Sequence, residues 1–354
     1  MIPNGFNRRP NPAFQKSNRP LPLNVQPVNG NLIIANQRVL PNRNVKDLVA
    51  EAKRRVDFFE DLQNFLLEPG NFYLTFGGAG DLVLLLAEAS QDPLAKIIFF
   101  ANAGSRNFIS QILFAFGIPN VVFDNCMGTP NAKKAYKLIA STQRLMPSQH
   151  LNANLDYEDW KNRPDFYARK LIRQANWKEK FGILEDKTNP IVTIAPSGSF
   201  KNNSPQKYLH KHELEKIINT YRLHNYSVYL VGSFADQEFY RLALKPEVYW
   251  LSVDNLADAR GKRKPIKVQE FFKIINSSDC CCSVDTWLKT YTSLIGVKTH
   301  ALMNRYNNVS RYGEMAGDYI FLNANLWESM TLNDVTDFIN RDCLINDLPS
   351  PTSL

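Results

Sequence analysis

Short apolar runs alternate with segments of helical periodicity along most of this chain. In the first half, NFYLTF (71–76), AKIIFFA (95–101) and NVVFD (120–124) are aromatic and β-branched, as buried strands are. Apolar residues recur at helical spacing in 81–90 and 106–116, between these runs. Strands that alternate with helices in this way predict a parallel α/β unit.

The pattern then changes and returns. Residues 132–183 are mainly helical and aromatic, and their basic and aromatic side chains could line an acceptor cleft or pack as an ordinary amphipathic core. A polar joint, LEDKTNP (184–190), follows. Beyond it, apolar runs alternate with helical segments again; the runs are 191–199, 226–233, 248–253, 279–284, 298–303 and 319–323. The α/β fold class with two Rossmann-like domains is therefore expected.

Three segments follow from this pattern. A basic arm rich in Asn and Pro, 1–45, precedes an N-terminal α/β domain with a helical insert, 46–185, and a C-terminal α/β domain, 186–354. The length of 354 residues is typical of two domains, and no repeat of a solenoid period is present.

Charge is concentrated in the arm. The chain has a formal net charge of +8, and residues 1–45 hold six cations and no acid, which leaves the remainder near neutral. The arm is expected to be irregular and suits a polyanion, whether DNA, an acidic glycan or an anionic headgroup. A solubilising tail without a partner is the alternative. The cations are Arg8, Arg9, Lys16, Arg19, Arg38 and Arg43.

Hydropathy and cysteine usage bound the class of protein. No apolar stretch reaches the roughly 20 residues of a membrane span, and the first 20 residues lack a secretory apolar segment. We expect a cytoplasmic protein, in the host cytoplasm if a virus encodes it. The five cysteines include the run 280–282, whose members alternate between strand faces and cannot form a regular metal cluster. Buried, reduced cysteines are expected.

One carboxylate lies at the first corner between a strand and a helix. In FGGAGDLVLLL, Asp81 follows Gly77, Gly78 and Gly80 and begins the helical pattern. Such corners at the carboxyl ends of parallel strands face the ligand crevice, and glycines there allow a substrate to approach the backbone. Asp81 is therefore either a helix cap or a functional acid.

Two corners of the second domain carry polar groups. The run IVTIAPSGS ends in Ser197, Gly198 and Ser199, and two lysines follow, Lys201 and Lys207, which suit phosphate oxygens. This loop does not match the P-loop pattern. In CCCSVDTW, Asp285 and Thr286 open a helix whose amides could hold a diphosphate, while Asp285 accepts hydroxyls of a sugar. Ordinary caps are again the alternative.

These motifs resemble a known family. IAPSGSF, YSVYLVGSFADQEFY, EFFKIINSSDCCCSVDT and LIGVKTHAL, in this order, are similar to the donor domain of heptosyltransferase-like glycosyltransferases of the two-domain GT-B type. GGAGDLVLLL is similar to the family's first corner, whose acid deprotonates the acceptor hydroxyl. The similarity covers residues 72–323. Where members carry Asp-Thr-Gly and then His, this chain has Trp287 and Thr290, and its first strand begins about seventy residues later than theirs.

The resemblance implies two domains that face a cleft and an inverting, metal-independent transfer of a sugar from a nucleotide sugar to an acceptor hydroxyl. Asp81 would be the base, with the glycines beside it on the acceptor side; Ser197, Gly198, Ser199, Lys201 or Lys207, Asp285 and Thr286 would bind the donor. No DxD-like metal motif stands in a suitable loop, and no cofactor besides the co-substrate is expected.

The sequence leaves both the acceptor and the activity open. The acceptor is either an envelope saccharide or, as the basic arm favours, a modified DNA base of the kind that virus-encoded transferases use. A catalytically inactive GT-B protein that binds nucleotide sugars or partners is a second alternative, and a sugar-nucleotide epimerase is a third. The sugar, the nucleotide base and the oligomeric state do not follow from the sequence.

Overall fold

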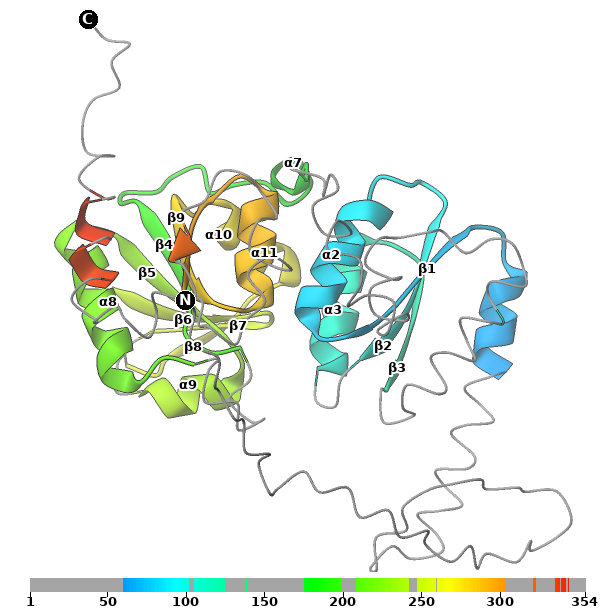
Figure 1. Ribbon diagram of the computed structural model, residues 1–354, viewed down its shortest axis with the longest axis horizontal. Helices are drawn as coiled ribbons and strands as arrows, with labels where there is room; N and C mark the ends of the chain where they lie inside the picture. Colours follow the sequence, from blue (N-terminus) through cyan, green and yellow to red (C-terminus); the bar gives the residue numbers. More distant parts are fainter. Residues whose placement is uncertain are drawn as a thin grey trace, which may run out of the picture. The chain divides into compact units, whose positions relative to one another are not determined.

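The computed structural model describes the elements of both α/β segments (Figure 1). It describes residues 60–101, 105–124, 138, 175–198, 208–241, 247–258, 260–302, 321–322, 335–337, 339–341 and 343. The basic arm, much of the helical insert and the loop with Ser199, Lys201 and Lys207 lie outside the described residues. The strands and helices below all belong to one compact unit, Leu62–Leu354. Among the described helices, none is long and apolar enough to cross a membrane.

The first sheet has three parallel strands in the order β1-β2-β3. Its elements are β1 (Asn71–Gly77), α2 (Ala79–Ala89), β2 (Ala95–Ala101), α3 (Arg106–Phe116) and β3 (Asn120–Asp124). Every side chain of β2 is buried, as a continuous apolar run predicts for a parallel sheet. Gly117 ends α3 in the left-handed conformation at φ 68°, which a glycine adopts without strain. The predicted parallel α/β unit is confirmed.

The second sheet has eight strands in the order β11-β10-β9-β4-β5-β6-β7-β8. Pairing is parallel from β11 to β6 and antiparallel for β7 and β8. The strands are β4 (Ile191–Ala195), β5 (Ser227–Val231), β6 (Val248–Ser252), β7 (Asn255–Ala257), β8 (Arg263–Pro265), β9 (Cys280–Val284), β10 (Lys298–Leu302) and β11 (Phe321–Leu322). The chain builds outward from β4 on one side and then returns to its other side with β9. The boundary between β4 and β9 is thus a topological switch point, where open α/β sheets form a crevice.

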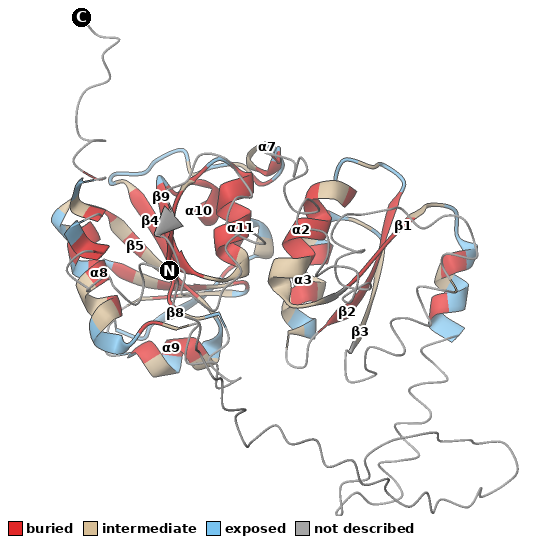
Figure 2. Ribbon diagram, in the orientation of Figure 1, coloured by how far each residue is buried: buried red, intermediate tan, exposed pale blue. Residues whose placement is uncertain are grey.

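Helices cover both faces of this sheet. One apolar core joins β4 and β9 to α8 (Lys211–Leu223), and another joins the opposite face to α10 (Val268–Asn276) and α11 (Trp287–Leu294). The short helices α7 (Trp177–Phe181) and α9 (Phe234–Tyr240) complete the set named here. Figure 2 shows β4, β9 and α11 buried. The α/β fold class expected from the sequence is confirmed.

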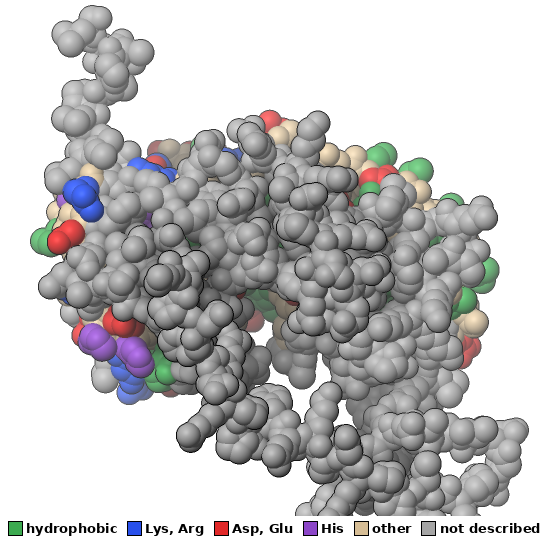
Figure 3. Space-filling view, in the orientation of Figure 1, with side chains coloured by type: hydrophobic (Ala, Val, Ile, Leu, Met, Phe, Trp, Pro, Cys, Tyr) green, Lys and Arg blue, Asp and Glu red, His purple; other side chains and the backbone are tan. Residues whose placement is uncertain are grey.

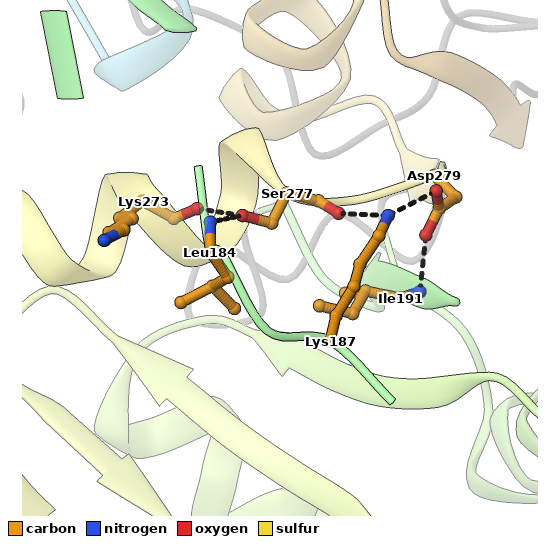
Figure 4. Close-up of polar contacts among 6 residues, drawn as sticks. All are labelled: Leu184, Lys187, Ile191, Lys273, Ser277 and Asp279. Atoms are coloured by element: carbon orange, nitrogen blue, oxygen red, sulfur yellow. Dashed lines mark hydrogen bonds and ion pairs between the residues drawn. The ribbon is translucent and has the colours of Figure 1, made fainter. Parts of the chain in front are cut away.

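The polar joint 184–190 is held against the second sheet (Figure 4). Ser277 Oγ accepts from the backbone N–H of Leu184 at 2.6 Å. The carboxylate of Asp279 accepts from Lys187 Nζ at 2.6 Å and from the backbone N–H of Ile191 at 2.8 Å. Because the loop between α10 and β9 supplies these groups, it fixes where β4 begins.

The cysteines of β9 are buried thiols. Residues 280–282 and Cys343 are free and buried, as expected, whereas Cys126 lies outside the described residues. The hydroxyl of Tyr221 in α8 forms a hydrogen bond with His300 Nδ1 at 2.6 Å. Cys280 Sγ lies 3.6 Å from the same nitrogen. Burial raises the pKa of the Cys281 thiol to about 12. These thiols are therefore structural and unreactive.

Charged surface groups of the described residues are mixed in sign. Figure 3 shows Lys, Arg, Asp and Glu side chains interspersed on one face, together with His.

The hairpin of β7 and β8 is the most basic described segment, and the apolar pattern did not predict these two strands. Each has three residues, and every residue of β8 is exposed. Charged residues and Pro265 on an edge strand oppose pairing with another chain.

Candidate functional site

The first corner joins β1 to α2 and holds Asp81. Asp81 Oδ2 accepts from the backbone N–H of Gly78 at 2.8 Å, so the carboxylate caps the helix. A Cβ on Gly77 would clash with this oxygen, and the φ of Gly77 is +137°. A glycine is thus needed at position 77 to seat the carboxylate itself, besides any substrate. Asp81 and its glycines are half-buried, which leaves the corner accessible.

The second corner follows β4. Ser197 forms an isolated antiparallel bridge with Tyr208, and the backbone N–H of Leu209 donates to the carbonyl of Pro196 at 2.8 Å. Tyr240 of α9 donates to the carbonyl of Leu209 at 2.6 Å. Burial raises the pKa of Tyr240 well above its usual value, with a further increase from Asp236, so its hydroxyl stays a donor. These bonds fix both ends of the loop 199–207.

Ser197 has an unusual side chain. Its Oγ is buried and has no hydrogen-bond partner among the described residues. Unpaired buried hydroxyls are rare, because each costs about 1 to 3 kcal/mol, and they call for a specific explanation such as a ligand. Ser197 is therefore a candidate contact for a ligand at the end of β4.

The third corner joins β9 to α11. Thr286 is the N-cap, and its Oγ1 accepts from the backbone N–H of Leu288 at 3.2 Å. Ser283 Oγ lies 2.9 Å from Thr286 Oγ1. Asp285 Oδ1 accepts from Lys289 Nζ at 3.1 Å. The helix begins two residues later than the sequence pattern indicated, because Asp285 and Thr286 precede its first turn.

The three corners come together. A Cβ on Gly198 would lie 2.7 Å from the carbonyl oxygen of Asp285 and 3.2 Å from Thr286 Cγ2, so the ends of β4 and β9 touch. A Cβ on Gly80 would lie 3.9 Å from the backbone N and Cα of Trp287. The first turn of α2 therefore approaches the first turn of α11. The start of α11 thus lies between Gly198 on one side and Gly80, the residue before Asp81, on the other.

The side chain of Trp287 packs in an aromatic cluster. Its ring packs against Phe108 of α3 at 5.4 Å between centroids, Phe271 of α10 at 5.9 Å and Tyr291 of α11 at 6.1 Å. The residue that replaces the family's glycine is thus a member of an aromatic cluster. Thr290, at the family's histidine position, is buried within α11.

A fourth corner follows β5, beside β4. Ser233 Oγ and its backbone N–H both donate to Asp236 Oδ2, at 2.5 and 2.9 Å. The ring of Trp250 covers Gly232, where a Cβ would lie 2.8 Å from its Cζ2. Asp236 is buried and serves as a cap. This acid is structural, although it resembles Asp81 in sequence context.

Lys289 is the site residue that sequence reasoning missed. Its side chain is 2% exposed, and that of its partner Asp285 is 10% exposed. The spacing of an acid and a lysine four residues later is the signal that could have identified this pair. Among the described residues, no group of three or more His, Cys, Asp or Glu side chains could hold a metal ion.

Solved structures similar to this chain include sugar-nucleotide enzymes, while no family model and no curated protein matches it. Escherichia coli ADP-heptose LPS heptosyltransferase II is 12% identical over 78% of this chain and 100% of that chain, with a TM-score of 0.45. A glycosyl transferase family 9 protein of Veillonella parvula DSM 2008 is 12% identical over 78% and 98%, with a TM-score of 0.47. A UDP-N-acetylglucosamine 2-epimerase is 11% identical over 79% and 88%, with a TM-score of 0.40.

Proposed function

We propose that this chain is an inverting, metal-independent glycosyltransferase that moves a sugar from a nucleotide sugar to an acceptor hydroxyl. The approach of the β1–α2 corner to the start of α11, where the β4 and β9 corners meet, carries the proposal. Gly80, the neighbour of Asp81 in sequence, lies beside the start of α11. Gly198 lies beside Asp285 and Thr286 at the same helix start, and the buried Oγ of the preceding Ser197 has no hydrogen-bond partner among the described residues. A base and an anion site at adjoining corners are the two groups that such a transfer needs.

The acceptor side depends on Asp81. The acceptor oxygen attacks the anomeric carbon, and its proton passes to the Asp81 carboxylate as the new C–O bond forms. The bond between the anomeric carbon and the phosphate oxygen breaks on the opposite face, which inverts the configuration. The bond from Gly78 orients the carboxylate without consuming it, since a carboxylate accepts several hydrogen bonds.

The donor side depends on the switch point of the second sheet. The diphosphate leaves with added negative charge, which the amides at the start of α11 and the hydroxyl of Ser197 are suited to stabilise. Ser199 and either Lys201 or Lys207 are proposed as further donors from the loop 199–207. Asp285 would accept hydroxyls of the sugar.

The Asp81→Asn variant tests the base. The amide oxygen of Asn still accepts from Gly78, so the cap is kept while basicity is lost. Turnover should fall by about 10² to 10⁴ with donor binding nearly unchanged. Release of nucleoside diphosphate from a panel of ADP-, GDP- and UDP-sugars would be measured with a saccharide and with hydroxymethylated duplex DNA as acceptors. Glu88→Gln, an equivalent change in α2, is the control, and unaltered turnover in Asp81→Asn would exclude this role.

The acceptor is proposed as an envelope saccharide, and the basic arm favours a modified DNA base as the second candidate. If the arm binds DNA phosphates, removal of residues 1–45 should weaken duplex binding and reduce its salt dependence by up to about 0.9 per lost phosphate contact. Duplex binding no better for the intact protein than for the truncated one would favour the saccharide. Donor binding without turnover on either acceptor would indicate an inactive binding protein.

A further inference from the structure

We propose that Lys289 is a specificity-determining residue that neutralises Asp285 and so allows the β9–α11 corner to accept a diphosphate. The inference rests on the proposed function, and it concerns a residue for which the family motif provides no counterpart. The motif names the acid at this corner and a later histidine, and it does not name the position of Lys289.

The pair is almost fully removed from water. Lys289 Nζ lies 3.1 Å from Asp285 Oδ1, and the two side chains are 2% and 10% exposed. Other residues of the segment 286–294 carry no charge. A buried lysine is costly unless it is paired, and its partner here is the residue that precedes the N-cap.

The position of Asp285 makes its charge matter. Its carbonyl oxygen lies where a Cβ on Gly198 would clash with it, and the next residue, Thr286, caps the helix whose amides would hold the diphosphate. A carboxylate that lacks its partner would repel a dianionic or trianionic ligand at this corner, because charges interact strongly where water is scarce. With Lys289 in place the pair is neutral, and the attraction of the helix start for anions remains.

A role in stability alone predicts something different. Buried ion pairs contribute little net stability compared with apolar residues of the same size, whereas the removal of one partner leaves an unpaired charge. The discriminating quantity is therefore the dependence of binding on the charge of the ligand. A loss of stability would affect a monophosphate and a diphosphate alike, whereas repulsion by Asp285 would weaken the diphosphate more.

The test is calorimetry on the full chain with UDP, ADP and GDP and the matching monophosphates. Lys289→Met should bind the preferred diphosphate about tenfold or more weakly, and the monophosphate should be affected less. Lys289→Arg should restore binding. The control is Lys298→Met, which removes a cation at the amino end of β10, remote from the carboxyl ends of the strands.

A second pair of variants keeps the test informative if Lys289→Met does not fold. Asp285→Asn should bind the free diphosphate at least as tightly as the wild type, and the double variant Asp285→Asn with Lys289→Met should return close to wild-type affinity. Unchanged binding in Lys289→Met, equal weakening of both ligands, or weaker diphosphate binding in Asp285→Asn would overturn the inference. If the wild type itself binds no diphosphate, the proposed function fails as well. If the wild type binds the diphosphate and turns over while one of these outcomes is found in the variants, only the role of Lys289 fails.

Discussion

A buried amide, that of Asn276, connects three helices, and its replacement should destabilise the protein measurably. Asn276 Nδ2 donates to the carbonyl of Trp177 at 3.0 Å and to that of Gly182 at 3.2 Å. Its Oδ1 accepts from the hydroxyl of Tyr291 at 2.9 Å. Asn276 is 2% exposed. α7, α10 and α11 are thus joined by one residue, and α11 carries the Thr286 corner.

The magnitude follows from these three bonds. Asn276→Leu keeps the branched shape of the side chain and removes all three bonds, each worth about 1 kcal/mol net. It leaves the buried Tyr291 hydroxyl without this acceptor at a cost of about 1 to 3 kcal/mol. Burial raises the pKa of Tyr291 well above its usual value, so the hydroxyl cannot avoid the cost by ionising. The apolar side chain of Leu regains about 1 kcal/mol. The free energy of unfolding should fall by about 3 to 5 kcal/mol.

Urea unfolding followed by circular dichroism and tryptophan fluorescence would measure this loss. Gln269→Leu, a polar-to-apolar change at an exposed position of the same helix, is the control and should alter stability by less than about 0.5 kcal/mol. Tyr291→Phe combined with Asn276→Leu should cost less than the sum of the two single changes, because they share one bond. A loss below about 1 kcal/mol, or additive effects, would refute the role of Asn276.

Two further predictions concern ionisation. Iodoacetamide at pH 8 should leave residues 280–282 unlabelled in the native protein and label them in urea, because a thiol with the pKa of Cys281, raised to about 12 by burial, is ionised in only ~1 molecule in 10⁴; labelling in the native state, read by peptide mass spectrometry, would contradict this. Although burial opposes it, hydrogen bonds from Asn71, Leu94 and Tyr73 lower the pKa of Asp92. The ionised Asp92 therefore stabilises the fold above the pKa of the unfolded state, and this contribution is lost as the pH falls through the pKa of the folded state. The free energy of unfolding should fall more for the wild type than for Asp92→Asn between about pH 5 and pH 2.5. Parallel curves of this free energy against pH would argue against the role of Asp92.

Short stretches of sequence were enough to predict most of the strands and helices and the corners that join them. The runs that became β4 and β9 are short and mostly apolar, with one hydroxyl side chain each. Gly198 and the cap Thr286 mark their ends, and these signals lie within a few residues of each strand. Asp81 was predicted at a corner for the same reason, and its capping bond was among the two expected alternatives. The β7–β8 hairpin was not predicted, because strands of three residues, one of them Arg-Lys-Pro, are too short to show an apolar periodicity.

Tertiary structure decided which corners meet. No local stretch of sequence predicts that β9 returns to the free side of β4, 85 residues or more along the chain. None predicts that Gly80 approaches Trp287. The ring of Trp287 joins an aromatic cluster from three helices, and Lys289 is buried against Asp285 because α11 is covered on its sides. Strand order and burial result from the packing of residues that are distant in sequence, so they depend on the whole core and cannot be read from any one segment.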